Sequence, residues 1–109
     1  MFGRMALDTL TVLAEPTRLR IVETLRVRER SVAELVAELR MSQPAVSKHL
    51  RVLREAGVVS ARRSAQQRIY RLQPGPFEEL DAWLRPYRAL WSRSLDRLEQ
   101  HLDRNHRLE

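Results

Sequence analysis

Cysteine is absent from the 109 residues, which excludes disulfides, thiolate metal sites and thiol redox switches. Only three glycines are present, and they do not form a Gly-rich phosphate-binding loop. The three histidines are not combined with a carboxylate and a nucleophile in a pattern typical of catalysis. We therefore expect a protein that is not an enzyme and that needs no cofactor.

Long apolar runs are missing as well. No stretch approaches the roughly 18 apolar residues that a transmembrane helix needs, and no signal-peptide pattern opens the chain. We therefore expect a soluble, cytoplasmic protein without membrane contact. The length of 109 residues suits one compact domain.

Acidic residues are in the minority. Lys and Arg number 20 against 14 Asp and Glu, which gives a net charge of +6. A hydrophobic fraction of 43% and a charged fraction of 31% are typical of a globular domain. The positive excess favours a polyanionic partner such as nucleic acid.

The most informative segment is residues 42–57. Ser42 suits a helix N-cap, Pro44 suits the first turn, and Gly57 suits a C-cap. The spacing of Val46, Leu50 and Leu53 predicts one buried stripe. The opposite face is polar and lacks large apolar residues, which suits entry into the DNA major groove; it carries Pro44, Ser47, Lys48, Arg51 and Glu55. An ordinary amphipathic surface helix is the alternative interpretation.

Three helices are predicted before this one. Residues 5–13 form a short apolar helix, and Pro16 starts a second helix in which Leu19, Val22 and Leu25 share one side, with Ile21 alongside. Ser31 and Glu34 form a capping box that starts a third. Only Arg40 and Met41 separate this third helix from Ser42. Two helices joined by so short a turn must cross steeply, as in a helix-turn-helix.

The pattern changes after Gly57. Residues 58–63 and 67–72 predict two short strands that flank Ser64-Ala65-Gln66. Four arginines lie in this hairpin: Arg62, Arg63, Arg68 and Arg71. A basic hairpin beside a recognition helix is typical of the wing of a winged helix-turn-helix. The alternative is a solvated hairpin whose arginines protect its edges.

The last third of the chain predicts a long amphipathic helix. Pro74-Gly75-Pro76 closes the first region, and residues 77–102 follow with apolar residues every three or four positions. Pro86 is expected to kink or split this helix. We expect a DNA-binding region over 1–73, a dimerisation helix over 74–104 in the same compact domain, and a tail over 105–109. The predicted dimer interface contains Leu7, Leu10, Leu80, Trp83, Leu84, Tyr87, Leu90, Trp91, Leu95 and Leu98.

Several motifs together resemble the ArsR/SmtB family of bacterial transcriptional repressors. They are residues 13–22 (LAEPTRLRIV), 42–50 (SQPAVSKHL), 53–59 (LREAGVV) and 70–72 (YRL). The C-terminal helix, with Pro86-Tyr87-Arg88 and Trp91, resembles a metal-independent branch of that family. The resemblance implies a homodimeric winged helix-turn-helix that binds a palindromic operator and represses transcription, including that of its own gene. The fold class expected is mainly α with a small β-hairpin (α+β).

The resemblance also assigns roles to residues. Gln43, Pro44, Ser47 and Lys48 match the positions that meet base edges in the major groove. We expect phosphate contacts from Ser31, Ser42, Arg51, Arg62, Arg63 and Arg68. The partners expected are double-stranded DNA and a second copy of the chain.

A metal site is not expected. The metal sensors of the family carry Cys-x-Cys where this chain has Ser31 and Ala33, and neither residue supplies a thiolate. His101, Asp103 and His106 lie where the family has another metal site, but the two histidines are five residues apart, not four. His49, at the edge of the buried stripe, is expected to pack or cap.

Two other functions remain open from the sequence. A winged helix can serve as a protein-interaction or dimerisation module without DNA. A repressor can also respond to a small apolar effector, which Trp83, Tyr87 and Trp91 would enclose, although core aromatics are the commoner meaning of such residues.

Overall fold

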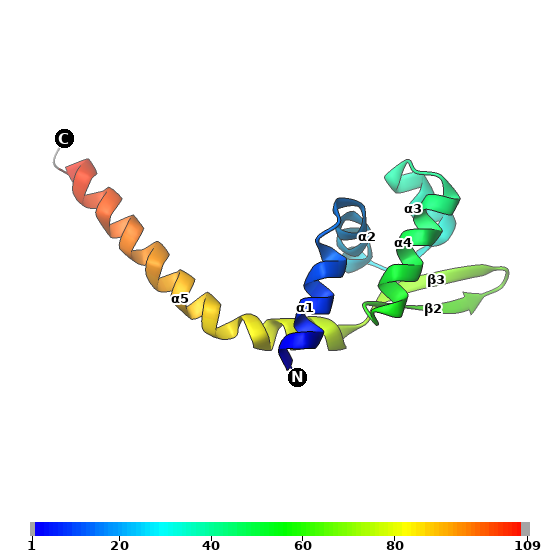
Figure 1. Cartoon of the computed structure of the whole chain (residues 1–109). Helices are drawn as coiled ribbons and strands as arrows, with labels where there is room; N and C mark the ends of the chain where they lie inside the picture. Colours follow the sequence, from blue (N-terminus) through cyan, green and yellow to red (C-terminus); the bar gives the residue numbers. More distant parts are fainter. Residues whose placement is uncertain (1, 108–109) are drawn as a thin grey trace.

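The computed structural model describes the backbone of residues 2–107 and the side chains of residues 4–104. A helical domain carries a small sheet at one end, and a long C-terminal helix projects from the other (Figure 1). The elements in chain order are α1 (Phe2–Leu13), α2 (Pro16–Val27), β1 (Arg30–Ser31), α3 (Val32–Leu39), α4 (Gln43–Glu55), β2 (Val59–Ser64), β3 (Gln67–Leu72) and α5 (Pro74–Arg107).

The core is formed where α2, α3, α4 and the sheet meet. The predicted stripe of α4 is confirmed, because Val46, Leu50 and Leu53 are buried. Burying each such side chain contributes about 1.5–3 kcal/mol to folding. In α2 the buried residues are Ile21, Val22 and Leu25, whereas Leu19 is 45% exposed. The expectation for Leu19 was wrong, because the buried side of α2 is centred on Ile21 and Leu25, four positions apart.

The predicted helix starts are confirmed. Ser31 Oγ accepts the Glu34 N–H at 3.1 Å, and Glu34 Oε1 accepts the Ser31 N–H at 3.0 Å, which completes the capping box of α3. Ser42 Oγ accepts the Ala45 N–H at 3.3 Å at the start of α4. Arg40 ends α3 in the left-handed region, with φ 55°, so the chain turns sharply between the two helices.

The sheet has one strand more than predicted. Its order is β1-β3-β2, with both pairs antiparallel. The hairpin of β2 and β3 is confirmed, and it turns at Ala65 and Gln66. The added strand, β1, has two residues, and Arg30 pairs with Tyr70 while Ser31 pairs with Ile69. Two residues show no alternation of polar and apolar positions, so their pairing becomes visible only in the folded chain.

Helix α5 is longer than predicted and unbroken. It begins at Pro74 and continues to Arg107, so Pro74-Gly75-Pro76 forms its first turn, where proline is tolerated because the N–H is unpaired anyway. Residues 105–107 of the predicted tail are helical, and residues 108 and 109 lie outside the described part. Pro86 lies inside the helix, whose axis bends in its yellow part (Figure 1) without splitting.

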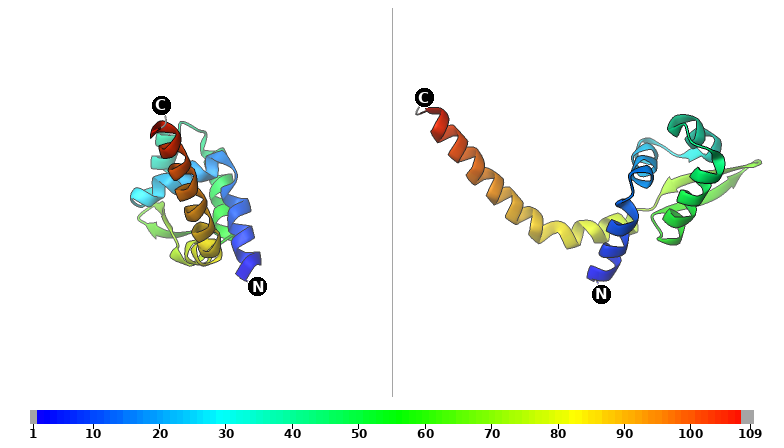
Figure 2. Two further views of the ribbon diagram at one scale, coloured as in Figure 1. Left: turned by 90° about the vertical axis from the view of Figure 1, so that its left-hand side faces the viewer. Right: turned by 45° about the horizontal axis from the view of Figure 1, so that its top comes forward.

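The two halves of α5 have different surroundings. The first half packs against α1, and the second half extends away from the domain (Figures 1 and 2), which gives a molecule of 65 × 37 × 20 Å. None of the helices in the described part combines the length and apolar character needed to cross a bilayer.

Gly57 is required by backbone conformation. It follows the C-cap of α4 with φ +75°, and the Val58 N–H closes the helix end on Leu53 O at 2.9 Å. A Cβ at this position would lie 3.9 Å from Pro76 Cγ, an ordinary contact. We therefore expect Gly57→Ala to destabilise the fold by about 1–2 kcal/mol through the backbone alone, measured by urea unfolding.

The matched control is Gly75→Ala. A Cβ there meets nothing within 4 Å, and in a helix alanine is favoured over glycine by roughly 0.5–1 kcal/mol. Gly75→Ala should cost less stability than Gly57→Ala, because Gly75 does not have a positive φ and its new Cβ is restricted only as in any residue before proline, here Pro76. Equal losses in the two variants would contradict this account of Gly57.

Candidate nucleic-acid interface

The polar face of α4 forms an exposed ridge. Gln43, Pro44, Ser47 and Lys48 are all exposed, while Val46, Leu50 and Leu53 on the other side are buried. Ser42 is exposed as well, at the N-terminus of the helix. The structure therefore brings the predicted base-reading residues together on one outward surface.

A hollow of about 720 Å³ lies between this ridge, the start of α3 and the hairpin. Its basic side chains are Arg51 and Arg54 from α4 and Arg68 from β3, with Glu55 as an acidic member. The full lining is Ser31, Val32, Ala33, Gln43, Ser47, Arg51, Arg54, Glu55, Gln66, Gln67, Arg68 and Tyr70. A concave surface rich in arginine and amide groups suits a sugar–phosphate backbone.

The hairpin adds a second, smaller hollow of about 220 Å³. It is lined by Arg54, Ala61, Arg62, Arg63 and Arg68. Arg63 and Arg68 are paired across the two strands, so their side chains emerge on the same face. The positive charge of α4 therefore continues onto the hairpin.

Two of the predicted phosphate contacts are placed differently from the others. Ser31 is only 2% exposed, and its Oγ already accepts the Glu34 N–H. Arg62 Nη2 lies 2.8 Å from Glu29 Oε2. Ser31 and Arg62 therefore make side-chain contacts within the protein, although Arg62 is exposed, as are Arg51, Arg63 and Arg68.

Two residues of this surface were missed by the sequence interpretation. Arg54 lines both hollows, and Gln66 lines the larger one. Arg54 lies three residues after Arg51 and seven after Ser47, so helical spacing places it on the same face. Gln66 is in the hairpin turn, where no sequence periodicity indicates direction.

Comparison with known proteins identifies the family. The family model described as "Bacterial regulatory protein, arsR family" matches residues 15–61. An HTH-type transcriptional regulator of Mycobacterium tuberculosis is 38% identical over 91 residues, which cover 84% of this chain and 82% of the relative. The chain belongs to the arsR family.

Two further relatives support this assignment. The HTH-type transcriptional repressor SmtB of M. tuberculosis is 48% identical over 65 residues, which cover 60% of this chain and 48% of the repressor. The chain thus spans about half the length of the first curated relatives it matches. A solved structure titled as a possible transcriptional regulator for arsenical resistance aligns with a TM-score of 0.68 and 43% identity, covering 85% of this chain and 94% of that one.

The positions that hold metal in some family members are filled differently in this arsR-family chain. Ser31 is buried as the cap of α3, and Ala33 is exposed beside it. Among the described residues, no group of three or more histidine and carboxylate side chains is placed to hold a metal ion. Of the candidates on α5, the His106 side chain lies outside the described residues.

His49 connects α4 to the start of α2. Its Nδ1 is buried without a hydrogen-bond partner and lies 3.7 Å from Glu15 Oε2. The same Oε2 accepts the Arg18 N–H at 2.8 Å as the cap of α2. This hydrogen bond, with a smaller contribution from His49, lowers the pKa of Glu15. The expectation that His49 packs at the edge of the stripe agrees with its half-buried position.

The predicted interface residues of α5 fall into two groups. Leu80, Trp83 and Leu84 are half-buried, in the half of the helix that packs against α1. The others on the helix are exposed: Tyr87, Leu90, Trp91, Leu95 and Leu98. On α1, Leu7 is exposed and Leu10 is half-buried. Trp83 and Tyr87 contact each other with ring centroids 5.1 Å apart.

The capping box of α3 predicts a pH dependence of stability. The Ser31 N–H, with a further contribution from Arg28, lowers the pKa of Glu34. The charged carboxylate therefore stabilises the fold above the ordinary glutamate pKa of about 4.3, and this stabilisation is lost as the pH falls through the lower pKa of the folded state.

We expect Glu34→Gln to flatten the loss of stability in acid, because glutamine retains an acceptor for Ser31 but does not ionise. The measurement is urea unfolding at a series of pH values below 6. Glu23→Gln, which removes another exposed carboxylate from outside any cap, is the control. Identical acid profiles for the parent and Glu34→Gln would show that the Glu34 carboxylate is not stabilised by its cap.

Proposed function

We propose that the chain is a sequence-specific DNA-binding transcriptional regulator that acts as a homodimeric repressor, including of its own gene, on an inverted-repeat operator. One observation carries this proposal: the exposed polar ridge of α4 is flanked by two arginine-lined hollows. The family assignment and the net charge of +6 point the same way.

Base reading is assigned to the N-terminal half of α4. Gln43 pairs with adenine through its amide, and Lys48 donates to guanine O6 and N7. Pro44 and Ser47 are short enough to let the helix sit close to the base edges. Because the N-terminal end of the helix is directed outward, its first turn and Ser42 also approach phosphate oxygens.

Phosphate contacts are assigned to the arginines around the two hollows. Arg51, Arg54, Arg63 and Arg68 supply this charge. With about 6–10 phosphates neutralised by a dimer, affinity should fall on the order of 10³- to 10⁵-fold between 50 and 200 mM salt.

The second copy of the chain is assigned to the exposed stripe of α5. Its residues between Tyr87 and Leu102 are 45% to 64% exposed, although they are large and apolar and repeat every three or four positions. A two-fold partner with the same stripe covers this surface. The dimer then presents two α4 ridges about 34 Å apart, one DNA turn.

Regulation without a thiolate metal site is part of the proposal. The chain has no cysteine, and the Ser31 hydroxyl is committed to the α3 cap. Operator binding is therefore expected to be insensitive to added Zn²⁺ or to a chelator. A Zn²⁺-induced loss of operator binding would contradict this part of the proposal.

A protein-interaction module is the competing function, and the α4 surface argues against it. Protein interfaces are usually centred on aromatic or aliphatic anchors, and the ridge has none. The deciding experiment is selection of bound duplexes from a random DNA pool, followed by titration of the enriched sequence at several salt concentrations. Failure to enrich an inverted repeat would reject the proposal.

Two substitutions separate base reading from phosphate contact. Lys48→Ala should cost about 1–3 kcal/mol on the operator and relax the preference at one base pair. Arg63→Ala should weaken all sequences alike and lower the salt slope by about one. Arg26→Ala on α2, which lines neither hollow, controls for the loss of one positive charge. The affinity of each of the three variants is measured by titration with operator and with scrambled duplexes. Equal losses of affinity in the three variants would contradict the docking mode.

A further substitution tests the dimer. Leu95→Glu places a charge in the exposed stripe of α5 and should convert a dimer of the 12.8 kDa chain into monomers in sedimentation velocity. Operator affinity should fall with it, because the two half-sites are no longer bound by one linked molecule. Ser92→Glu adds the same charge outside the stripe and should leave the dimer intact. A parent chain that sediments as a monomer contradicts the assignment.

A further inference from the structure

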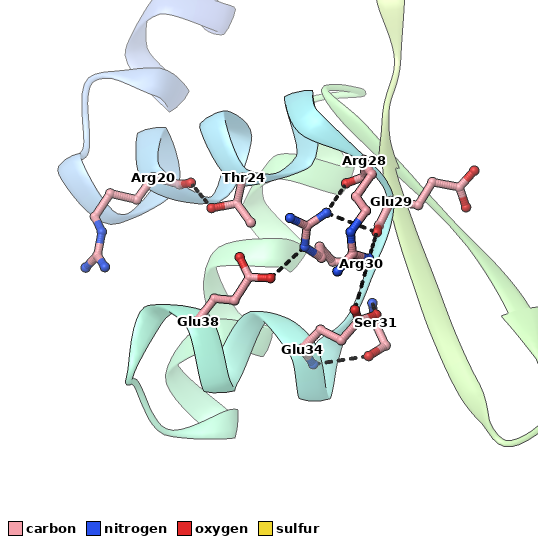
Figure 3. Close-up of polar contacts among 8 residues, drawn as sticks. All are labelled: Arg20, Thr24, Arg28, Glu29, Arg30, Ser31, Glu34 and Glu38. Carbon is pink, nitrogen blue, oxygen red and sulfur yellow. Dashed lines mark hydrogen bonds and ion pairs between the residues drawn. The ribbon is translucent and has the colours of Figure 1, made fainter.

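A buried arginine lies in the short strand β1. Arg30 is 7% exposed, and its Nε donates to Glu38 Oε1 of α3 at 2.7 Å. Its Nη1 donates to the backbone oxygens of Arg28 at 3.0 Å and of Glu29 at 3.4 Å. Figure 3 shows the guanidinium between Glu38 and this stretch of backbone. Because a buried charge is costly unless it is paired, Arg30 holds residues 28–29 firmly against α3.

The carboxylate of Glu29 continues this chain of contacts. Its side chain points away from the Arg30 guanidinium (Figure 3). At that end, Glu29 Oε2 accepts a hydrogen bond from Arg62 Nη2 at 2.8 Å, although the two residues are 33 positions apart. A continuous polar network thus connects Glu38 of α3, through Arg30 and Glu29, to Arg62 of β2.

The strand register places this link across the whole sheet. Arg62 and Ser31 both pair with Ile69 of the central strand, so Glu29 and Arg62 join the two outer strands over β3. Beyond Ser31, β1 has ended, and the hairpin continues as two strands only. The pair therefore lies where the projecting tip begins.

The same register separates Arg62 from its arginine neighbours. Arg63 pairs with Arg68, and Arg68 shares a face with Tyr70, which lines the large hollow. Because side chains alternate along a strand, the Arg62 side chain emerges on the opposite face. Arg62 also borders the small hollow, but its guanidinium is bound to Glu29.

We propose that Arg62 positions the hairpin through Glu29 and Arg30, and does not bind phosphate. The network sets the angle of the wing, defined here as residues 59–72, relative to α3 and α4. The inference rests on the proposed DNA binding, because the wing angle decides which phosphates Arg63 and Arg68 reach. Since Glu29 already neutralises Arg62, DNA displaces no counterion from it.

The expected size of the effect is modest. The side chains of Arg62 and Glu29 are 57% and 43% exposed, and exposed ion pairs contribute little individually. We expect loss of the link to weaken operator binding about two- to fivefold, the range that corresponds to exposed pairs. The test therefore depends on the direction of the change in each variant and on whether the changes in the two single variants add in the double variant.

The first test uses no DNA. Amide hydrogen exchange is compared in the parent, Glu29→Gln, Arg62→Gln and the double variant. Exchange over residues 62–69 should be faster in all three variants to the same degree, with exchange in α4 unchanged. Unchanged exchange over residues 62–69 in either single variant overturns the positioning role, whatever the protein binds.

The second test is a double-mutant cycle on the enriched operator. Both single variants and the double variant should bind about two- to fivefold more weakly, with the salt slope of the parent. Arg63→Gln is the control whose slope should fall by about one. A phosphate-binding Arg62 gives the opposite result: Glu29→Gln strengthens binding, because it removes a negative charge, and Arg62→Gln lowers the slope.

Failure of the proposed function is distinguishable from failure of this inference. If the parent chain binds no duplex, the proposed function fails, and the exchange experiment still decides whether Glu29 and Arg62 order the wing. If the parent binds and the two single effects are additive in the double variant, DNA binding stands and the positioning role of Arg62 falls.

Discussion

Burial of one apolar side of α4 is the constraint on which the surface chemistry depends. Val46, Leu50 and Leu53 pack with Leu35 of α3 and with Ile21 and Leu25 of α2 in one core. A helix fixed on that side has no rotational freedom, so the side chains of Gln43, Ser47 and Lys48 must face outward. The hydrophobic effect therefore decides which side chains of α4 face outward.

Hydrogen bonds at the helix ends fix where α3 and α4 begin. The hydroxyl of Ser31 and the carboxylate of Glu34 satisfy each other's backbone amides, and at the start of α4 the Ser42 hydroxyl accepts the Ala45 N–H. The turn between the two helices passes through Arg40, whose backbone is in the left-handed region. Polar residues thus stabilise the fold as well as cover its surface. Although Ser31 lines the large hollow, its hydroxyl serves as the cap of α3.

The arginines of this chain differ in what their side chains contact. Arginines outnumber every other charged residue type in this chain, but they do not form one class. Arg30 is buried and paired with Glu38, Arg62 is paired with Glu29, and Arg54 and Arg68 line both hollows. A count of basic residues in the hairpin therefore overstates the charge available to a polyanion. The distinction depends on which partner the fold brings to each side chain.

The amino-acid sequence by itself determined the helices of the core, the caps at Ser31 and Ser42, the hairpin and the polar ridge. These features follow from local rules, in which spacing of three and four residues, capping pairs and alternation act over short distances. Only the tertiary structure decided that Arg30 and Ser31 form a third strand, that Arg62 meets Glu29, that Arg54 joins the hollows and that α5 continues from Pro74 through Pro86. The strand pairing and the contact between Glu29 and Arg62 depend on segments distant in the chain, whose pairing costs loop-closure entropy and leaves no local pattern. Helical spacing places Arg54 on the face of Arg51 and Ser47, but the hairpin that completes the hollows comes from another part of the chain. The first part of α5 packs against α1, a segment distant in the chain, and the helix continues through Pro86 although proline disfavours a helix interior.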